Sequence, residues 1–204
     1  MIKRILFLLT CLASSLSAQE VTGGEVALEL QAKQTVKAAV QSLGNEVLKS
    51  NFSYAVEHMY PRWRERQAKR LGSEQKMLEA FNNAGAQMQE MGITIDSFEA
   101  LEPQKAYHVH PKMKDGVKQI TTSADLHYEV LVFVPTRMKM SFMLEGQPKR
   151  SFMRESFQVA VAREGSEQWT FIDGATIRVV DLRSLFPLLP KNLELPEKRD
   201  IEVK

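Results

Sequence analysis

The sequence predicts an α+β fold in which helices come first and antiparallel strands follow. Apolar residues recur every three or four positions before residue 92, which indicates amphipathic helices, and alternate with polar residues after it, which indicates strands. Turn-forming pairs such as Asp115-Gly116 and Gly165-Ser166 separate the alternating segments. Because one face of the sheet must be covered, we expect the helices to pack in the concave face of a curled antiparallel sheet.

Four helices are expected in the N-terminal half. Apolar residues at helical spacing predict a first long helix over about residues 25–49, weakened near Gly44. A short second helix, a basic third helix over residues 62–70 and a fourth helix ending at residue 91 follow. The boundaries are indicated by two N-cap residues, a proline suited to a first helical turn and a terminating glycine: Asn51, Ser73, Pro61 and Gly92.

Strands are expected from residue 93 onward. The alternating segments are residues 93–98, 106–110, 120–134, 138–145, 153–161 and 169–180. Pro135-Thr136 is expected to interrupt the longest run, because proline cannot donate to a sheet. An amphipathic segment over residues 182–189 follows, and the charged tail after it is expected to be loosely held. The chain thus divides into residues 1–18, a single α+β domain over residues 19–180, and a C-terminal helical segment and charged tail over residues 181–204.

Residues 1–18 have the layout of a secretory signal peptide. Lys3 and Arg4 precede an apolar run over residues 5–12, and small residues lead to an expected cleavage after Ala18. The run is too short to span a bilayer, so we expect no transmembrane segment in the mature chain. A minor alternative is a lipoprotein anchored through Cys11. The protein is therefore expected in the periplasm or the extracellular space.

Composition excludes several classes of function. Removing residues 1–18 takes away two of the 27 basic residues, none of the 25 acidic ones and the single cysteine. A mature chain with balanced charge is a poor binder of nucleic acid, because non-specific binding depends on neutralising phosphates. Without cysteine it can have neither a disulfide nor a thiol nucleophile. No cofactor motif is present, and none is expected.

The order of a long first helix and long meandering strands, together with two shorter segments, resembles the nuclear transport factor 2-like superfamily, also described as cystatin-like and including SnoaL-like members. The two segments are the short helix Asn51-Phe52-Ser53-Tyr54-Ala55-Val56 and the closing strand Trp169-Thr170-Phe171-Ile172-Asp173-Gly174, and the likeness covers roughly residues 25–180. The resemblance implies a cone-shaped sheet that wraps a helix and leaves a cavity. Some members are isomerases or dehydratases, whereas many exported members are non-catalytic binding or assembly modules. It also suggests a homodimer formed through the sheet.

An isomerase-like site needs a carboxylate base in an apolar cavity and hydrogen-bond donors nearby. Glu155 is the candidate base, because it lies in the alternating row that contains Phe157. The alternative is that Glu155 lies at a wetter strand end or pairs with an arginine such as Arg137. Six residues are candidates for lining a ligand cavity: Tyr54, His58, Tyr60, Tyr128, Phe157 and Trp169.

Metal binding is a further alternative. His108 and His110 are two positions apart on an expected strand and so share a face, where His127 or Glu129 would be a third ligand. Met138, Met140 and Met143 are a different feature, because thioethers bind Cu(I). Core packing explains these methionines better, and an inner face of Met and Phe would equally suit a lipid-like ligand.

One basic cluster precedes the fourth helix. It consists of Arg62, Arg64, Arg66, Lys69 and Arg70. Such a cluster attracts anionic partners, although a solvated helix face explains it as well. Because no convincing polar constellation accompanies the apolar faces, we favour an exported non-catalytic module that binds an apolar small molecule or a partner protein. The alternatives are an isomerase- or dehydratase-like enzyme and a metal-handling periplasmic protein.

Overall fold

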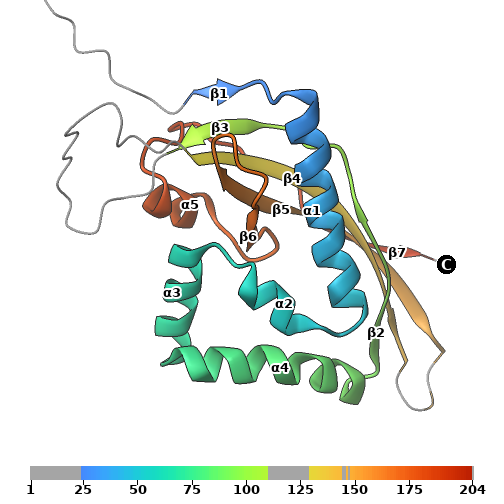
Figure 1. The fold of residues 1–204 in the computed structure, drawn as a ribbon. Coiled ribbons are helices and arrows are strands. Elements are labelled where there is room, and N and C mark those ends of the chain that lie inside the picture. The colour runs from blue at the N-terminus through green and yellow to red at the C-terminus, as the bar shows by residue number, and fades with distance from the viewer. Residues whose placement is uncertain (1–23, 110–128, 144–145, 147, 204) are drawn as a thin grey trace, which may run out of the picture.

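The computed structural model describes residues 24–109, 129–143, 146 and 148–203. Over these residues the chain has the α+β composition that the sequence predicts (Figure 1). The helices are α1 (Leu30–Leu48), α2 (Phe52–Glu57), α3 (Pro61–Leu71), α4 (Glu74–Glu90) and α5 (Val179–Leu185). The strands are β1 (Glu25–Val26), β2 (Ile93–Ala100), β3 (Ala106–Val109), β4 (Glu129–Phe142), β5 (Arg150–Arg163), β6 (Thr170–Asp173) and β7 (Arg199–Val203).

All seven described strands belong to one open antiparallel sheet built around the long β4–β5 hairpin. The order is β1-β3-β4-β5-β6, while β2 pairs with β4 and β7 pairs with β5 further along the hairpin. The β4–β5 register is continuous from Glu129 opposite Arg163 to Phe142 opposite Arg150. We call residues 129–135 and 157–163 the proximal half of the hairpin, and residues 136–142 and 150–156 its distal half.

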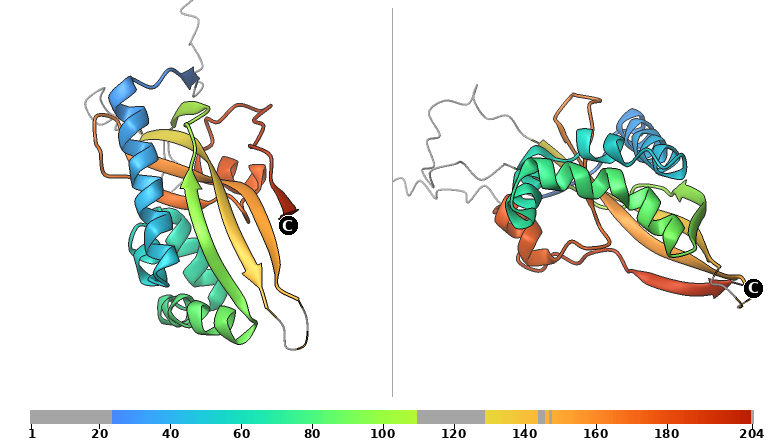
Figure 2. Two further views of the ribbon diagram at one scale, coloured as in Figure 1. Left: turned by 90° about the vertical axis from the view of Figure 1, so that its right-hand side faces the viewer. Right: turned by 90° about the horizontal axis from the view of Figure 1, so that it is seen from below.

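The proximal half is buried on both faces. Val130, Val132 and Val134 pack against α1 on one face, which we call the α1 face. Leu131 and Phe133 point to the opposite α5 face, where α5, the α2–α3 junction and the segment after α5 cover them. Figure 2 shows α1 and α4 on one side of the sheet and α5 on the other. The expectation that helices cover only one face is therefore corrected: the C-terminal segment supplies a second cover.

The segment after residue 180 is part of the fold, which corrects the expectation of a loosely held tail. The last strand of the 19–180 region ends at Asp173 instead of reaching residue 180. Apolar side chains of α5 and the residues after it are buried in the α5-face cluster: Leu182, Leu185, Phe186, Leu189 and Leu193. The chain then returns along β5 as β7, with Arg199 opposite Glu155 and Val203 opposite Ser151.

The first helix begins five residues later than predicted. Glu25 and Val26 pair with β3, opposite Tyr107 and Ala106, and Glu29 has an extended backbone before the helix starts. Pairing with an otherwise open strand edge outweighs the helical pattern of these residues. Of the predicted caps, Ser73 accepts a hydrogen bond from the Lys76 amide. The Asn51 side chain does not cap α2, because it binds Glu46 and Ser53 instead.

Pro135 does not interrupt β4, contrary to the sequence-based expectation. The Pro135 carbonyl accepts a hydrogen bond from the Leu101 amide at 2.8 Å, on the side of the β2–β3 connection. In an antiparallel strand the amide and carbonyl of one residue point the same way, so the missing N–H also faces this connection and not β5. The ladder with β5 therefore loses no hydrogen bond. The predicted turn at Asp115-Gly116 and the strand residues 120–128 lie outside the described residues.

Gly44 brings α1 close to the sheet. It is buried inside the helix, and a Cβ atom built at this position would lie 1.9 Å from the Phe98 ring. The absence of a side chain thus lets Phe98 of β2 pack directly on the α1 backbone. No helix among the described residues is long and apolar enough to cross a bilayer.

We predict that Gly44→Ala lowers the free energy of unfolding by about 1–3 kcal/mol, because the added methyl group overpacks the Phe98 contact. Gly85→Ala in α4 is the matched control. Its Cβ would lie 3.2 Å from the Phe52 ring, and alanine favours a helix interior by about 0.5–1 kcal/mol. Urea unfolding of both variants measures the difference, and a Gly44→Ala protein as stable as Gly85→Ala would contradict the packing.

Candidate functional site

The α1 face changes character beyond the proximal core. Because directly opposite residues of paired strands share a face, the register defines successive rows across β2, β4 and β5. The distal rows are Ile93–Phe142, Ile95–Met140–Phe152 and Phe98–Met138. Met140 is buried, but the other side chains are only half-buried and, apart from Phe98, none belongs to a buried core cluster.

A polar strip borders these apolar rows on the β5 side. Thr136 lies opposite Ser156, and Gln158 lies opposite Asp173 of β6. Arg154 occupies the row of Met138 and is held by Asp200 of β7 through two hydrogen bonds of 2.8 Å. We call the half-buried apolar rows together with this strip the distal surface. It combines a methionine- and phenylalanine-rich area with a few converging polar groups, which is the composition of small-molecule sites.

Two groups of the strip are incompletely satisfied. The Ser156 hydroxyl is buried and has no hydrogen-bond partner among the described residues. Such a group costs free energy unless a partner arrives. The Asp173 residue is exposed as a whole, yet desolvation by the surrounding protein raises the pKa of its carboxyl. Interactions that lower this pKa oppose the shift; they come from the Ala175 amide, Arg154, Lys198 and Gln158. The carboxylate is therefore less well solvated than a free one.

The secondary structure explains why this surface is left partly open. α1 lies over β2, where Gln41 binds both the Phe98 carbonyl and the Ala100 amide. α4 crosses the same side of the sheet (Figure 2), but of its apolar residues only Met77 is fully buried. Near the hairpin end, Met91 and Met143 are 52% and 62% exposed. The helices therefore shield the distal rows without closing over them.

Glu155 lies on the same face of β5 as Phe157, as the sequence predicts, but beyond the end of the core. Its carboxylate accepts hydrogen bonds from Arg199 at 2.5 Å and from Arg137 at 3.0 Å. These partners lower the pKa of Glu155, Arg199 most. A general base in an apolar cavity needs the opposite environment. The geometry matches the ion-paired strand-end alternative.

Tyr60 contacts the carboxylate of Glu129, a residue that the sequence did not indicate as a general base. Its buried hydroxyl donates to Glu129 at 2.9 Å, beside Phe186. Burial raises the pKa of the Glu129 carboxyl, while Tyr60, Arg62 and Arg163 lower it. Burial first, and then Glu129, raise the pKa of Tyr60. The pair links the start of β4 to the α2–α3 junction on the α5 face and is separate from the distal surface.

Four of the candidate cavity residues belong to two different packed clusters. Tyr60 and Phe157 belong to the α5-face cluster, whereas Trp169 and the half-buried Tyr54 belong to the α1-face cluster. Tyr54 and His58 stack with ring centroids 3.9 Å apart. Tyr128 lies outside the described residues.

The metal-site candidates find no support in the described part of the chain. His110 lies outside it. His108 Nε2 is 3.4 Å from the Glu164 carboxylate. Residues 24–109, 129–143 and 148–203 contain no group of three or more His, Cys, Asp or Glu side chains that would hold a metal ion.

Most of the basic cluster on α3 is used within the molecule. Arg62 donates to the Leu185 carbonyl and Arg66 to the Ser184 hydroxyl, so both tie α3 to α5. Arg64 pairs with Glu74. The two remaining members, Lys69 and Arg70, are exposed at the end of α3. Most side chains of the predicted basic patch therefore hold α3 against neighbouring helices.

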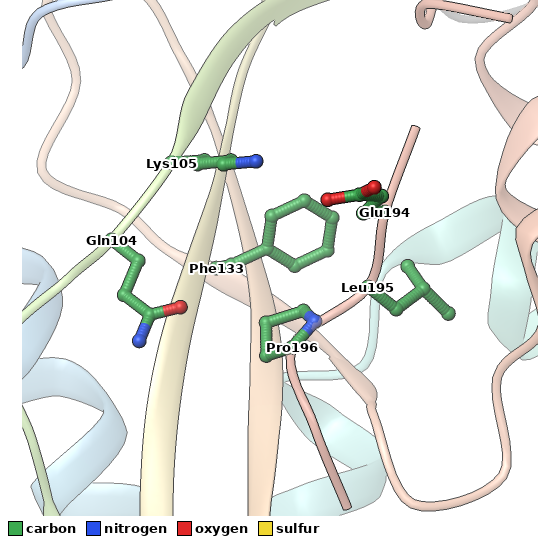
Figure 3. Close-up of a pocket in the computed structure, with 6 residues that line it drawn as sticks. All are labelled: Gln104, Lys105, Phe133, Glu194, Leu195 and Pro196. Atoms are coloured by element: carbon green, nitrogen blue, oxygen red, sulfur yellow. The ribbon is translucent and has the colours of Figure 1, made fainter. Parts of the chain in front are cut away.

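A small pocket lies on the α5 face between the β2–β3 connection and the C-terminal segment (Figure 3). It measures about 110 Å³ and is lined by Gln104, Lys105, Phe133, Glu194, Leu195 and Pro196. Ligand pockets usually measure roughly 300–1,000 Å³. This pocket is therefore too small to be the ligand cavity that the family resemblance implies.

Comparison with known proteins gives no matching family model, no similar curated protein and no similar solved structure. The functional conclusion therefore depends on the geometry of the chain itself.

We predict opposite pH responses for two glutamates. Burial raises the folded-state pKa of Glu129, so its favourable contribution is full at low pH and is lost as the pH rises from about 4. Glu129→Gln should therefore gain stability relative to the parent protein as the pH rises. The pKa of Glu155 is lowered, so Glu155→Gln should lose relative stability over the same rise. Urea unfolding across this range measures both slopes, and slopes of the same sign would contradict the two environments.

Proposed function

We propose that this chain is an exported, non-catalytic module that binds a mostly apolar small molecule on its distal surface. The observation that carries the proposal is the group of half-buried apolar side chains Met138, Phe142 and Phe152, which lie in neighbouring rows of the α1 face under helices that do not close over them. Contiguous apolar areas at a protein surface mark binding sites, and these half-buried side chains lie near the exposed Met91 and Met143 at the hairpin end. Methionine side chains also adapt to ligands of different shape.

The proposal includes the finer family-level fold, in which the sheet curls around the leading helices as in nuclear transport factor 2-like proteins. The packing of Phe98 against Gly44 supports it, because it seats α1 closely in the sheet. Coverage of the other face by α5 is an addition to that arrangement. A homodimer through the sheet would then use its distal half, where the α5 face carries no helix.

Export is proposed on the charged start, the apolar run and the small residues that precede Ala18. The mass of the mature protein tests this step. Loss of residues 1–18 is expected, and an intact chain in the cell extract alone would contradict it.

We predict that the neutral fluorescent probe N-phenyl-1-naphthylamine binds the folded protein, and that Met138→Gln weakens this binding by about tenfold. Replacing a buried apolar contact by an amide costs on the order of 1–3 kcal/mol. Met153→Gln is the matched control, because Met153 is also half-buried on the hairpin but points to the α5 face. Fluorescence titration measures both, and equal losses, or no probe binding at all, would refute the proposed site.

A further inference from the structure

We infer that the distal surface selects an amphiphile whose hydrogen-bond-donating head, an amine or a hydroxyl group, faces Asp173 and Ser156. The apolar chain of this ligand lies over Met138 and Met140. The inference rests on the proposed function and adds the chemical class of the ligand. It follows from how polar and apolar rows succeed one another along the hairpin and from where the nearby cations are engaged.

The rows give the surface a polar end and an apolar end. Along β4 the α1 face runs from Val134 through Thr136 and Met138 to Met140. At a rise of about 3.3 Å per residue, these three two-residue steps span about 20 Å. Asp173 lies in the row of Val134, and Phe152 lies in the row of Met140. A ligand that follows the strand therefore has one end beside the carboxylate and the other among apolar side chains, near Arg150, whose guanidinium lies 5.2 Å from the centre of the Phe152 ring.

The polar end carries one carboxylate, Asp173, beside the hydroxyls of Thr136 and Ser156 and the amide of Gln158. The Asp173 carboxylate accepts from the Ala175 amide at 3.1 Å and from Gln158, and it has no ion-pair partner within 4 Å among the described residues. The buried Ser156 oxygen, one row away, is unpaired. A head that donates a hydrogen bond to the Asp173 carboxylate can also exchange one with the Ser156 hydroxyl, which both donates and accepts. A carboxylate head would instead meet Asp173 as a like charge.

The two nearest cations are already engaged by the C-terminal segment. Arg154 gives both of its hydrogen bonds to Asp200. The Lys198 ammonium donates to the carbonyls of Gly174, Ala175 and Ile177 at 3.3–3.4 Å. β7 and the residue before it therefore hold both cations in fixed hydrogen bonds, although both still lower the pKa of the Asp173 carboxyl through space. Asp173 is thus the charged group of the polar end that lacks an ion-pair partner within 4 Å among the described residues.

Displacement of N-phenyl-1-naphthylamine by three twelve-carbon competitors tests the inference. Near neutral pH we expect dodecylamine and dodecanol to displace the probe at lower concentration than dodecanoate. For the amine the advantage should be at least about tenfold, as one charge-assisted hydrogen bond implies. Asp173→Asn should remove most of the preference for the amine. Asp200→Asn should strengthen dodecanoate binding, because it releases Arg154.

Asp181→Asn is the matched control, because Asp181 forms its ion pair with Arg178 on α5, away from the distal surface. It should leave the order of the competitors unchanged. Probe binding that is lost in Met138→Gln, together with equal displacement by all three competitors or an order unaffected by Asp173→Asn, would overturn the inference and leave the proposed function standing. Absence of probe binding to the parent protein would overturn both.

Discussion

Burial of the proximal β4–β5 hairpin on both faces is the constraint on which the rest of the structure depends. Leu131 and Phe133 face α5 while Val132 and Val134 face α1, so neighbouring residues of one strand contribute to two different cores. Each fully buried side chain of this kind contributes about 1.5–3 kcal/mol. Helices from both ends of the chain must therefore pack here, which fixes the position of every other element relative to this short stretch of sheet.

The same constraint explains the distal surface. The proximal core ends at Val134, but the hairpin continues for another seven residue pairs, from Thr136 opposite Ser156 to Phe142 opposite Arg150. There α1 packs on β2 and leaves Met138, Phe142 and Phe152 half-buried. On the α5 face these residues form ion pairs, with Glu155 bound by Arg137 and Arg199. On the α1 face they stay apolar under an incomplete cover. β7 braces this extension through its charged pairs and thereby holds Arg154 in place.

Local patterns in the sequence predicted the helices and the α+β class, because helical spacing and caps such as Ser73 act over a few residues. Features that depend on contacts between distant segments could not be predicted from such local patterns. The pairing of Val26 with β3 depends on a strand about eighty residues away. The alternating pattern placed Glu155 on the correct face of its strand. The point where the core ends could not be predicted, because it depends on which helices cover the sheet. Asp173 and Ser156 were missed as site residues, and Glu129 was considered only as a metal ligand, because their environments come from distant segments. The one usable signal was that Arg154, Ser156 and Gln158 are polar at alternate positions of a strand that continues on the same face with Ala160 and Ala162.

Amide hydrogen exchange along β4, measured with and without N-phenyl-1-naphthylamine, tests most directly whether one strand crosses two environments. Residues 131–134 should exchange only through global unfolding, whereas residues 137–142 should open locally at lower free energy. The probe should slow exchange in the distal residues selectively. Uniform protection along β4 that the probe does not change would contradict a sealed proximal core joined to an accessible distal surface.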